Sequence, residues 1–121
     1  IGIHQLPCPE YIYLGLKRKP MTKEEYDTKE FRNLCKDISK DTVAIIKEYV
    51  NNGYNVVGLV GINDSPTCSI TGNKGILMEE LLALCKEANI ELNTIDVPID
   101  YHDGVKGKEF INKFKGFISS S

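Results

Sequence analysis

The sequence predicts a three-layer α/β domain, Rossmann-like or flavodoxin-like, with a mostly parallel sheet. Short apolar runs alternate with longer segments of helical periodicity in the order strand, helix, strand, helix, strand, helix. Strands joined by helical crossovers must run parallel. The run at 55–62 is almost wholly apolar and β-branched, which is typical of a strand buried on both faces. A length of 121 residues supports one domain, spanning 1–121.

Each element has its own signal in the chain. Residues 1–6 are predicted as the first strand, which the prolines at positions 7 and 9 end. Residues 11–16 form a short helical or irregular piece, and Thr22 with Glu25 makes a capping box that opens a short helix at 24–26. The remaining elements are helices at 28–52, 75–88 and 105–118 and strands at 55–62 and 90–99.

The long helices are predicted from apolar residues at three- and four-residue spacing. In 28–52 the apolar stripe runs from Phe31 to Tyr49, and Gly53 suits the left-handed position that ends a helix. Cys35 and Cys85 lie on the inward stripes of two helices, so we expect them to be buried as small hydrophobic side chains.

Composition excludes several classes of protein. A formal net charge of −2 argues against a general nucleic-acid binder, which needs a basic face. No apolar run approaches the roughly 20 residues that span a bilayer, and no signal peptide is visible. We therefore expect a cytoplasmic protein that acts on a small molecule, without a nucleic-acid or membrane partner. The first residue is Ile rather than Met, and the predicted first strand begins at once, so we also expect an upstream strand to be missing. A sheet without that strand would expose an edge, which favours a homo-oligomer or an accompanying chain.

Two cysteines are predicted to lie at one edge of the sheet. Ligands of open parallel sheets bind outside the carboxyl ends of the strands, and Cys8 and Cys68 follow two of those ends. Thiolates from separate loops suit a soft metal or an iron–sulfur cluster. A helix after Cys68 is expected to lower the pKa of its thiol. The alternative is two unrelated loop thiols.

Polar residues near these thiols are candidates for proton transfer and substrate binding. Glu10 is two residues beyond Cys8 and could act as a general acid or base, or be a solvated loop carboxylate. Ser65 could contact a substrate or stabilise the turn at Ser-Pro. His102 with Asp103 could form a metal or acid–base pair, although a surface turn is the more common role of such a pair. Two other functions stay open: an anion-binding domain on the loop 65–75 at a helix N-terminus, and a redox-active or zinc-binding thiol pair.

Three segments of the chain carry a resemblance. QLPCPE (5–10), YLGLKRKPMTKEEYDT (13–28) and VGINDSPTCSI (60–70) resemble an uncharacterised bacterial and archaeal family related to the 2-thiouracil desulfurases. The resemblance implies a [4Fe-4S] cluster held by three cysteines, at which a C–S bond of a small thiolated, nucleobase-like compound is cleaved. Cys8 and Cys68 match two of the cluster ligands.

The resemblance also assigns roles to the polar neighbours. Glu10 matches the proton-transfer residue and Ser65 the substrate-orienting residue of the desulfurases. The family's remaining cluster cysteine belongs to a segment upstream of Ile1, and Ser69 stands where the family has a glycine.

Overall fold

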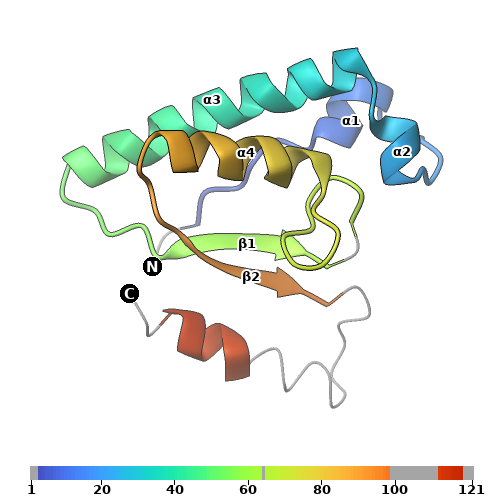
Figure 1. The fold of residues 1–121 in the computed structure, drawn as a ribbon. Helices are drawn as coiled ribbons and strands as arrows, with labels where there is room; N and C mark the ends of the chain where they lie inside the picture. Colours follow the sequence, from blue (N-terminus) through green and yellow to red (C-terminus); the bar gives the residue numbers. More distant parts are fainter. Residues whose placement is uncertain (1–2, 64, 99–111, 119–121) are drawn as a thin grey trace.

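The computed structural model describes residues 3–63, 65–98 and 112–118 (Figure 1). Its labelled elements are α1 (Pro9–Leu14), α2 (Lys23–Tyr26), α3 (Lys29–Asn51), β1 (Gly58–Ile62), α4 (Ile76–Glu87) and β2 (Asn93–Val97). Residues 112–118 form a further helix.

The predicted three-layer, Rossmann-like or flavodoxin-like sheet is wrong. In the part of the chain that the structure describes, five helices accompany a sheet of only two strands. The strand expected at 1–6 is absent over residues 3–6, which form no regular structure. Pro7 and Pro9 cannot donate to a ladder, and a strand also needs a neighbour to pair with. The parallel direction was predicted correctly, because β1 and β2 pair from Gly58↔Asn93 to Ile62↔Val97.

The helices agree with the sequence prediction within a few residues. Thr28 caps α3 through its side chain, which accepts a hydrogen bond from Phe31 N. The capping box of Thr22 and Glu25 is present and opens α2. These caps satisfy backbone donors that a helix start would otherwise leave unpaired. Of the terminal helix predicted at 105–118, residues 105–111 lie outside the described residues.

The core lies between α3, α4 and the strands. Figure 1 shows α3 and α4 on one side of the two strands and the helix at 112–118 on the other. Cys35 and Cys85 are 0% and 3% exposed within two apolar clusters, as predicted. Tyr49, placed on the inward stripe by its spacing, is instead 40% exposed near the end of α3, while Val43 is buried.

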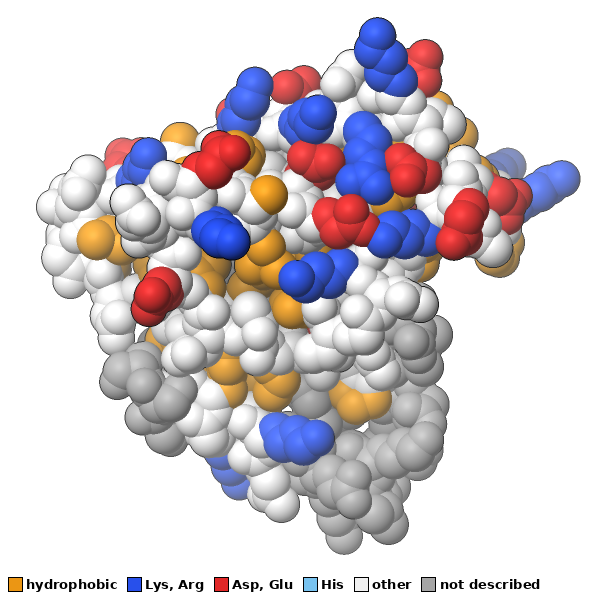
Figure 2. Space-filling view, viewed as in Figure 1, with side chains coloured by type: hydrophobic (Ala, Val, Ile, Leu, Met, Phe, Trp, Pro, Cys, Tyr) orange, Lys and Arg blue, Asp and Glu red, His pale blue; other side chains and the backbone are white. Residues whose placement is uncertain are grey.

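A network of charges joins the ends of α2, α3 and α4. Arg32 bonds to both carboxylate oxygens of Asp27 at 2.7 and 3.0 Å, and to Glu79 at 3.2 Å and Glu80 at 3.1 Å. Lys23 also pairs with Glu79. Figure 2 shows acidic and basic side chains interleaved over this part of the surface.

This network makes part of the stability dependent on pH. The hydrogen bond from Arg32 lowers the pKa of Asp27. Burial raises the pKa of Glu79, but the hydrogen bonds from Lys23 and Arg32 outweigh burial and lower it overall. A carboxyl whose pKa is lower in the folded state stabilises the fold above its unfolded pKa, and this contribution is lost as pH falls through the folded value.

Candidate functional site

Cys8 and Glu10 stand at the start of α1. Cys8 is the N-cap residue with an extended backbone (φ −82°, ψ 110°), and Pro9 occupies the first helical turn. Proline suits this position because its fixed φ is already helical and the first N–H groups need no intrahelical acceptor. The Cys8 thiol is exposed, whereas Glu10 is partly buried.

The loop that carries Cys68 folds back onto the strand that precedes it. Ile62 N donates to the carbonyl oxygen of Cys68 at 2.9 Å. From β2, the carboxylate of Asp96 accepts hydrogen bonds from Ile70 N at 3.0 Å, from Thr71 N at 2.8 Å and from the Thr71 hydroxyl at 2.7 Å. These bonds fix the loop against both strands.

The same loop occupies the N-terminus of α4. Ile76 N donates to the carbonyl of Pro66 at 3.0 Å, and Met78 N donates to the carbonyl of Thr67 at 3.3 Å. Two N–H groups of the first helical turn are therefore already paired within the protein. Because a bound anion would need such donors, this geometry disfavours the anion-binding domain considered for residues 65–75.

Glu10 is the centre of a hydrogen-bond group that joins distant segments. Its Oε2 accepts from the Thr67 hydroxyl at 2.7 Å, and its Oε1 accepts from the Tyr26 hydroxyl at 3.0 Å and from Arg18 Nε at 3.4 Å. Thr67 and Tyr26 are almost fully buried, at 0% and 1% exposure. The carboxylate is thus held at a fixed place beside the loop of Cys68.

Thr67 links this carboxylate to the Cys68 thiol. The Thr67 hydroxyl oxygen lies 3.4 Å from Cys68 Sγ. A hydroxyl has one hydrogen, and in Thr67 it is directed to Glu10. The Thr67 hydroxyl therefore lies between the Glu10 carboxylate and the Cys68 sulfur, in contact with both.

The predicted lowering of the Cys68 pKa is wrong. Burial raises the pKa of Cys68, the nearby Cys8 and Glu10 raise it further, and hydrogen bonds with Thr67 and Ser65 oppose the rise only in part. The helix after Cys68 begins at Ile76, close to its predicted start, but Ile76 N and Met78 N donate to carbonyl oxygens of the loop rather than to the thiol. In the protein without a metal, the structure therefore favours the neutral thiol.

The remaining predicted site residues are Ser65, His102 and Asp103. Ser65 Oγ accepts from Cys68 N at 3.0 Å and from Thr67 N at 3.3 Å, so its role in stabilising the turn is confirmed. His102 and Asp103 lie outside the described residues. Sequence reasoning missed Thr67, Tyr26 and Arg18. Of these, only Thr67 had a signal, as a hydroxyl residue inside the SPTC motif.

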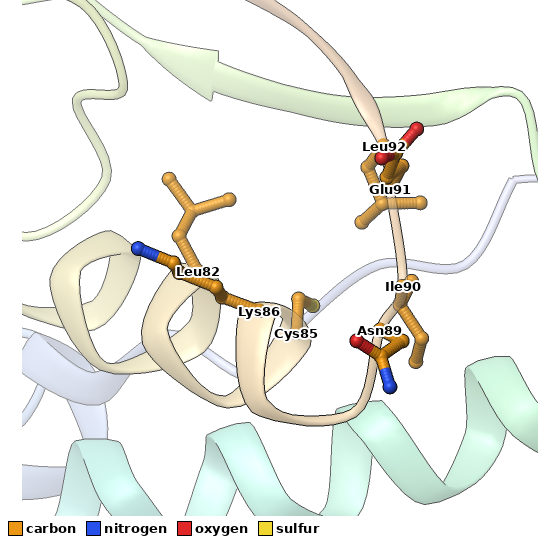
Figure 3. Close-up of a pocket in the computed structure, with 7 residues that line it drawn as sticks. All are labelled: Leu82, Cys85, Lys86, Asn89, Ile90, Glu91 and Leu92. Carbon is orange, nitrogen blue, oxygen red and sulfur yellow. The ribbon is translucent and has the colours of Figure 1, made fainter.

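The described residues contain no ready-made metal site, and the pocket at the end of α4 lies away from the predicted site. All four cysteines are free, and over residues 3–63, 65–98 and 112–118 no three His, Cys, Asp or Glu side chains are grouped to hold a metal ion. A pocket of about 410 Å³ lies between the end of α4 and the segment leading into β2, lined by Leu82, Cys85, Lys86, Asn89, Ile90, Glu91 and Leu92 (Figure 3). It contains none of the residues of the predicted site.

Comparison with known proteins places the chain in a family. An uncharacterised protein of Methanocaldococcus jannaschii, MJ0003, is 47% identical over 111 residues, which cover 89% of this chain and 70% of that protein. The chain belongs to the MJ0003 family. No family model and no solved structure matches the chain. Among the described helices, none has the length and apolar character required to cross a membrane.

Proposed function

We propose that this member of the MJ0003 family is an iron–sulfur-dependent, desulfurase-like protein that cleaves a C–S bond in a small thiolated, nucleobase-like compound. The observation that carries the proposal is the chain of contacts Glu10–Thr67–Cys68, in which Glu10 and Thr67 are 57 positions apart in the sequence. The CPE and SPTC segments, which carry the resemblance to the desulfurases, meet in this chain of contacts.

The residues present fit part of a [4Fe-4S] site. Cys8 and Cys68 would be two of its ligands, since both are free thiols outside the fully buried core. Cys35 and Cys85 are 0% and 3% exposed inside apolar clusters, whereas Cys8 is exposed and Cys68 is only partly buried, so Cys35 and Cys85 are the less accessible thiols. The third ligand would come from outside residues 1–121. When bound, such a cluster supplies an iron with an open position for sulfur.

The protein's own side chains would bind the substrate and carry its proton. The Glu10 carboxylate is held by Tyr26 and Arg18 and would hold or deliver a proton at Oε2, where Thr67 now donates. Ser65 Oγ accepts two backbone hydrogen bonds, and its hydroxyl hydrogen would orient a substrate acceptor.

The rival functions make different predictions for the cysteines. In a non-catalytic ligand-binding domain, replacing Cys8 and Cys68 together with serine leaves ligand affinity unchanged, whereas the desulfurase proposal predicts complete loss of activity. In a redox-active or zinc-binding pair, thiol counts with and without reductant, or zinc content, change instead.

Desulfuration itself is the test of this function. We expect the full-length protein, reconstituted anaerobically with iron and sulfide and then freed of excess reagent, to release sulfide from a thiolated pyrimidine. The oxo pyrimidine should form in equal amount, because water replaces the sulfur. The same protein before reconstitution is the control. Iron-loaded protein that releases no sulfide from any thiolated pyrimidine or purine tried would refute the proposed reaction.

A further inference from the structure

We infer that the C-terminal end of α3 carries a binding site for a small primary alkylammonium ion. A cavity of about 460 Å³ lies there, which is within the usual size of small-ligand sites. It is lined by Ile45, Glu48, Tyr49, Asn52 and Tyr54. Figure 1 shows this end of α3 on the side away from α1 and from the loop between β1 and α4, so the inference does not depend on the proposed desulfurase function.

Two tyrosine rings of the cavity are held in place by the way the helix ends. Gly53 has a φ of 84°, in the left-handed region, and this turn directs the chain back over the helix. Tyr54 N then donates to the carbonyl oxygen of Tyr49 at 3.0 Å, and Gly53 N donates to that of Val50 at 3.1 Å. The rings of Tyr49 and Tyr54 meet edge to face, with centroids 5.5 Å apart and planes at 80°. Rings fixed in this way need little rearrangement to receive a ligand.

The two rings keep much of their surface in contact with solvent. Tyr49 and Tyr54 are 40% and 64% exposed, although each packs against the other. The face of an aromatic ring attracts a cation, because the ring quadrupole is negative there. The pair can therefore close the helix end and also bind a positively charged group.

The charges at this end of α3 also favour a cation. The last turn of α3 contains no basic residue, so no side chain of that turn offsets the negative end of a 23-residue helix. The carboxylate of Glu48 takes part in none of the ion pairs found in the described part of the chain. The Asn52 amide donates through Nδ2 to the carbonyl oxygen of Glu48 at 2.7 Å, which leaves its Oδ1 as an acceptor.

These groups together suit an alkylammonium ion better than a metal ion. A primary ammonium group has three donors, which the Glu48 carboxylate and Asn52 Oδ1 can accept. Its methylene groups would lie against Ile45 and the tyrosine rings. A metal ion such as Ca²⁺ instead requires six or more oxygen ligands. The expected ligand is therefore a short apolar chain with a positively charged end.

Titration of the full-length protein with n-butylammonium chloride at constant ionic strength tests the site without iron. We expect the NMR signals of the Tyr49 and Tyr54 rings to shift in a saturable way, with a Kd on the order of millimolar because so small a ligand makes few contacts. 1-Butanol, which has the same chain and no charge, should bind at least about 10-fold more weakly. No saturable shift, or equal binding of 1-butanol, would overturn the inference.

Two substitutions assign the binding to this cavity. Glu48→Gln is expected to weaken the binding of butylammonium by about 5- to 10-fold, and Tyr54→Leu by about 5-fold. Leucine keeps an apolar contact with Tyr49, and thermal unfolding checks that both variants fold. Glu87→Gln is the matched control, because Glu87 is an exposed carboxylate in the last turn of α4, and its affinity should be unchanged. Equally tight binding in E48Q or Y54L would refute the site.

Discussion

Replacing Gly61 with alanine is expected to destabilise the fold by about 3 kcal/mol and to displace the loop of Cys68. A Cβ at this position would lie 2.8 Å from Ile70 Cγ1 and even closer to the carboxylate of Asp96 and the carbonyl oxygen of Cys68. The Cys68 carbonyl belongs to the backbone, and the Asp96 carboxylate accepts hydrogen bonds from three donors, so neither group can move away without losing contacts. Thermal or denaturant unfolding measures the loss.

Gly116→Ala is the matched control. Gly116 lies in the helix at 112–118, and no atom of the described residues beyond its own helix backbone lies within 4 Å of an added Cβ, so this change should be neutral or slightly stabilising. If G61A unfolds at the same denaturant concentration as the unmodified protein, the close packing of the Cys68 loop on β1 is incorrect. The expected loss therefore tests the local geometry that positions the site.

Glu10→Gln is expected to lower the rate of sulfide release by about 10²- to 10⁴-fold, the usual contribution of a general acid or base. Glutamine is nearly the same size and can still accept from Tyr26, but its amide nitrogen cannot accept from Thr67. The proton carrier is lost while the shape of the site is largely kept. Initial rates of iron-loaded protein at saturating thiolated pyrimidine provide the measurement.

Glu87→Gln serves as the control, because Glu87 is an exposed residue at the end of α4. Its rate should equal that of the unmodified protein. Full activity in E10Q at normal iron content would remove Glu10 from the reaction and leave it as a residue that merely joins α1 to the loop. Thermal unfolding of both variants separates this outcome from a folding defect.

The helices were predictable because their signals are local. The capping box of Thr22 and Glu25 indicated α2, periodicity indicated α3, and the apolar stripe of α4 placed Leu81 and Cys85 correctly. The sheet was not predictable in the same way, because a strand pairs with a partner that is often distant in the chain. Residues 3–6 have strand-like composition but pair with nothing in the described structure.

The candidate site was predictable only in part. Two loop cysteines after separate strand-like runs suggested a shared edge, and the structure links Glu10 to Cys68 through Thr67. Tyr26 and Arg18 had no signal, because a core tyrosine and a residue of a basic run look ordinary in sequence. The pKa of Cys68 was misjudged because its burial, which raises the pKa, depends on how the loop folds.

Iron content after anaerobic reconstitution of the full-length protein tests whether Cys68 is a cluster ligand. We expect about four irons per chain, retained in Cys85→Ser and lost in Cys68→Ser, because Cys85 is a buried core residue and Cys68 is a proposed ligand. An unmodified protein that binds no iron, or a C68S variant that keeps the full amount, would contradict it.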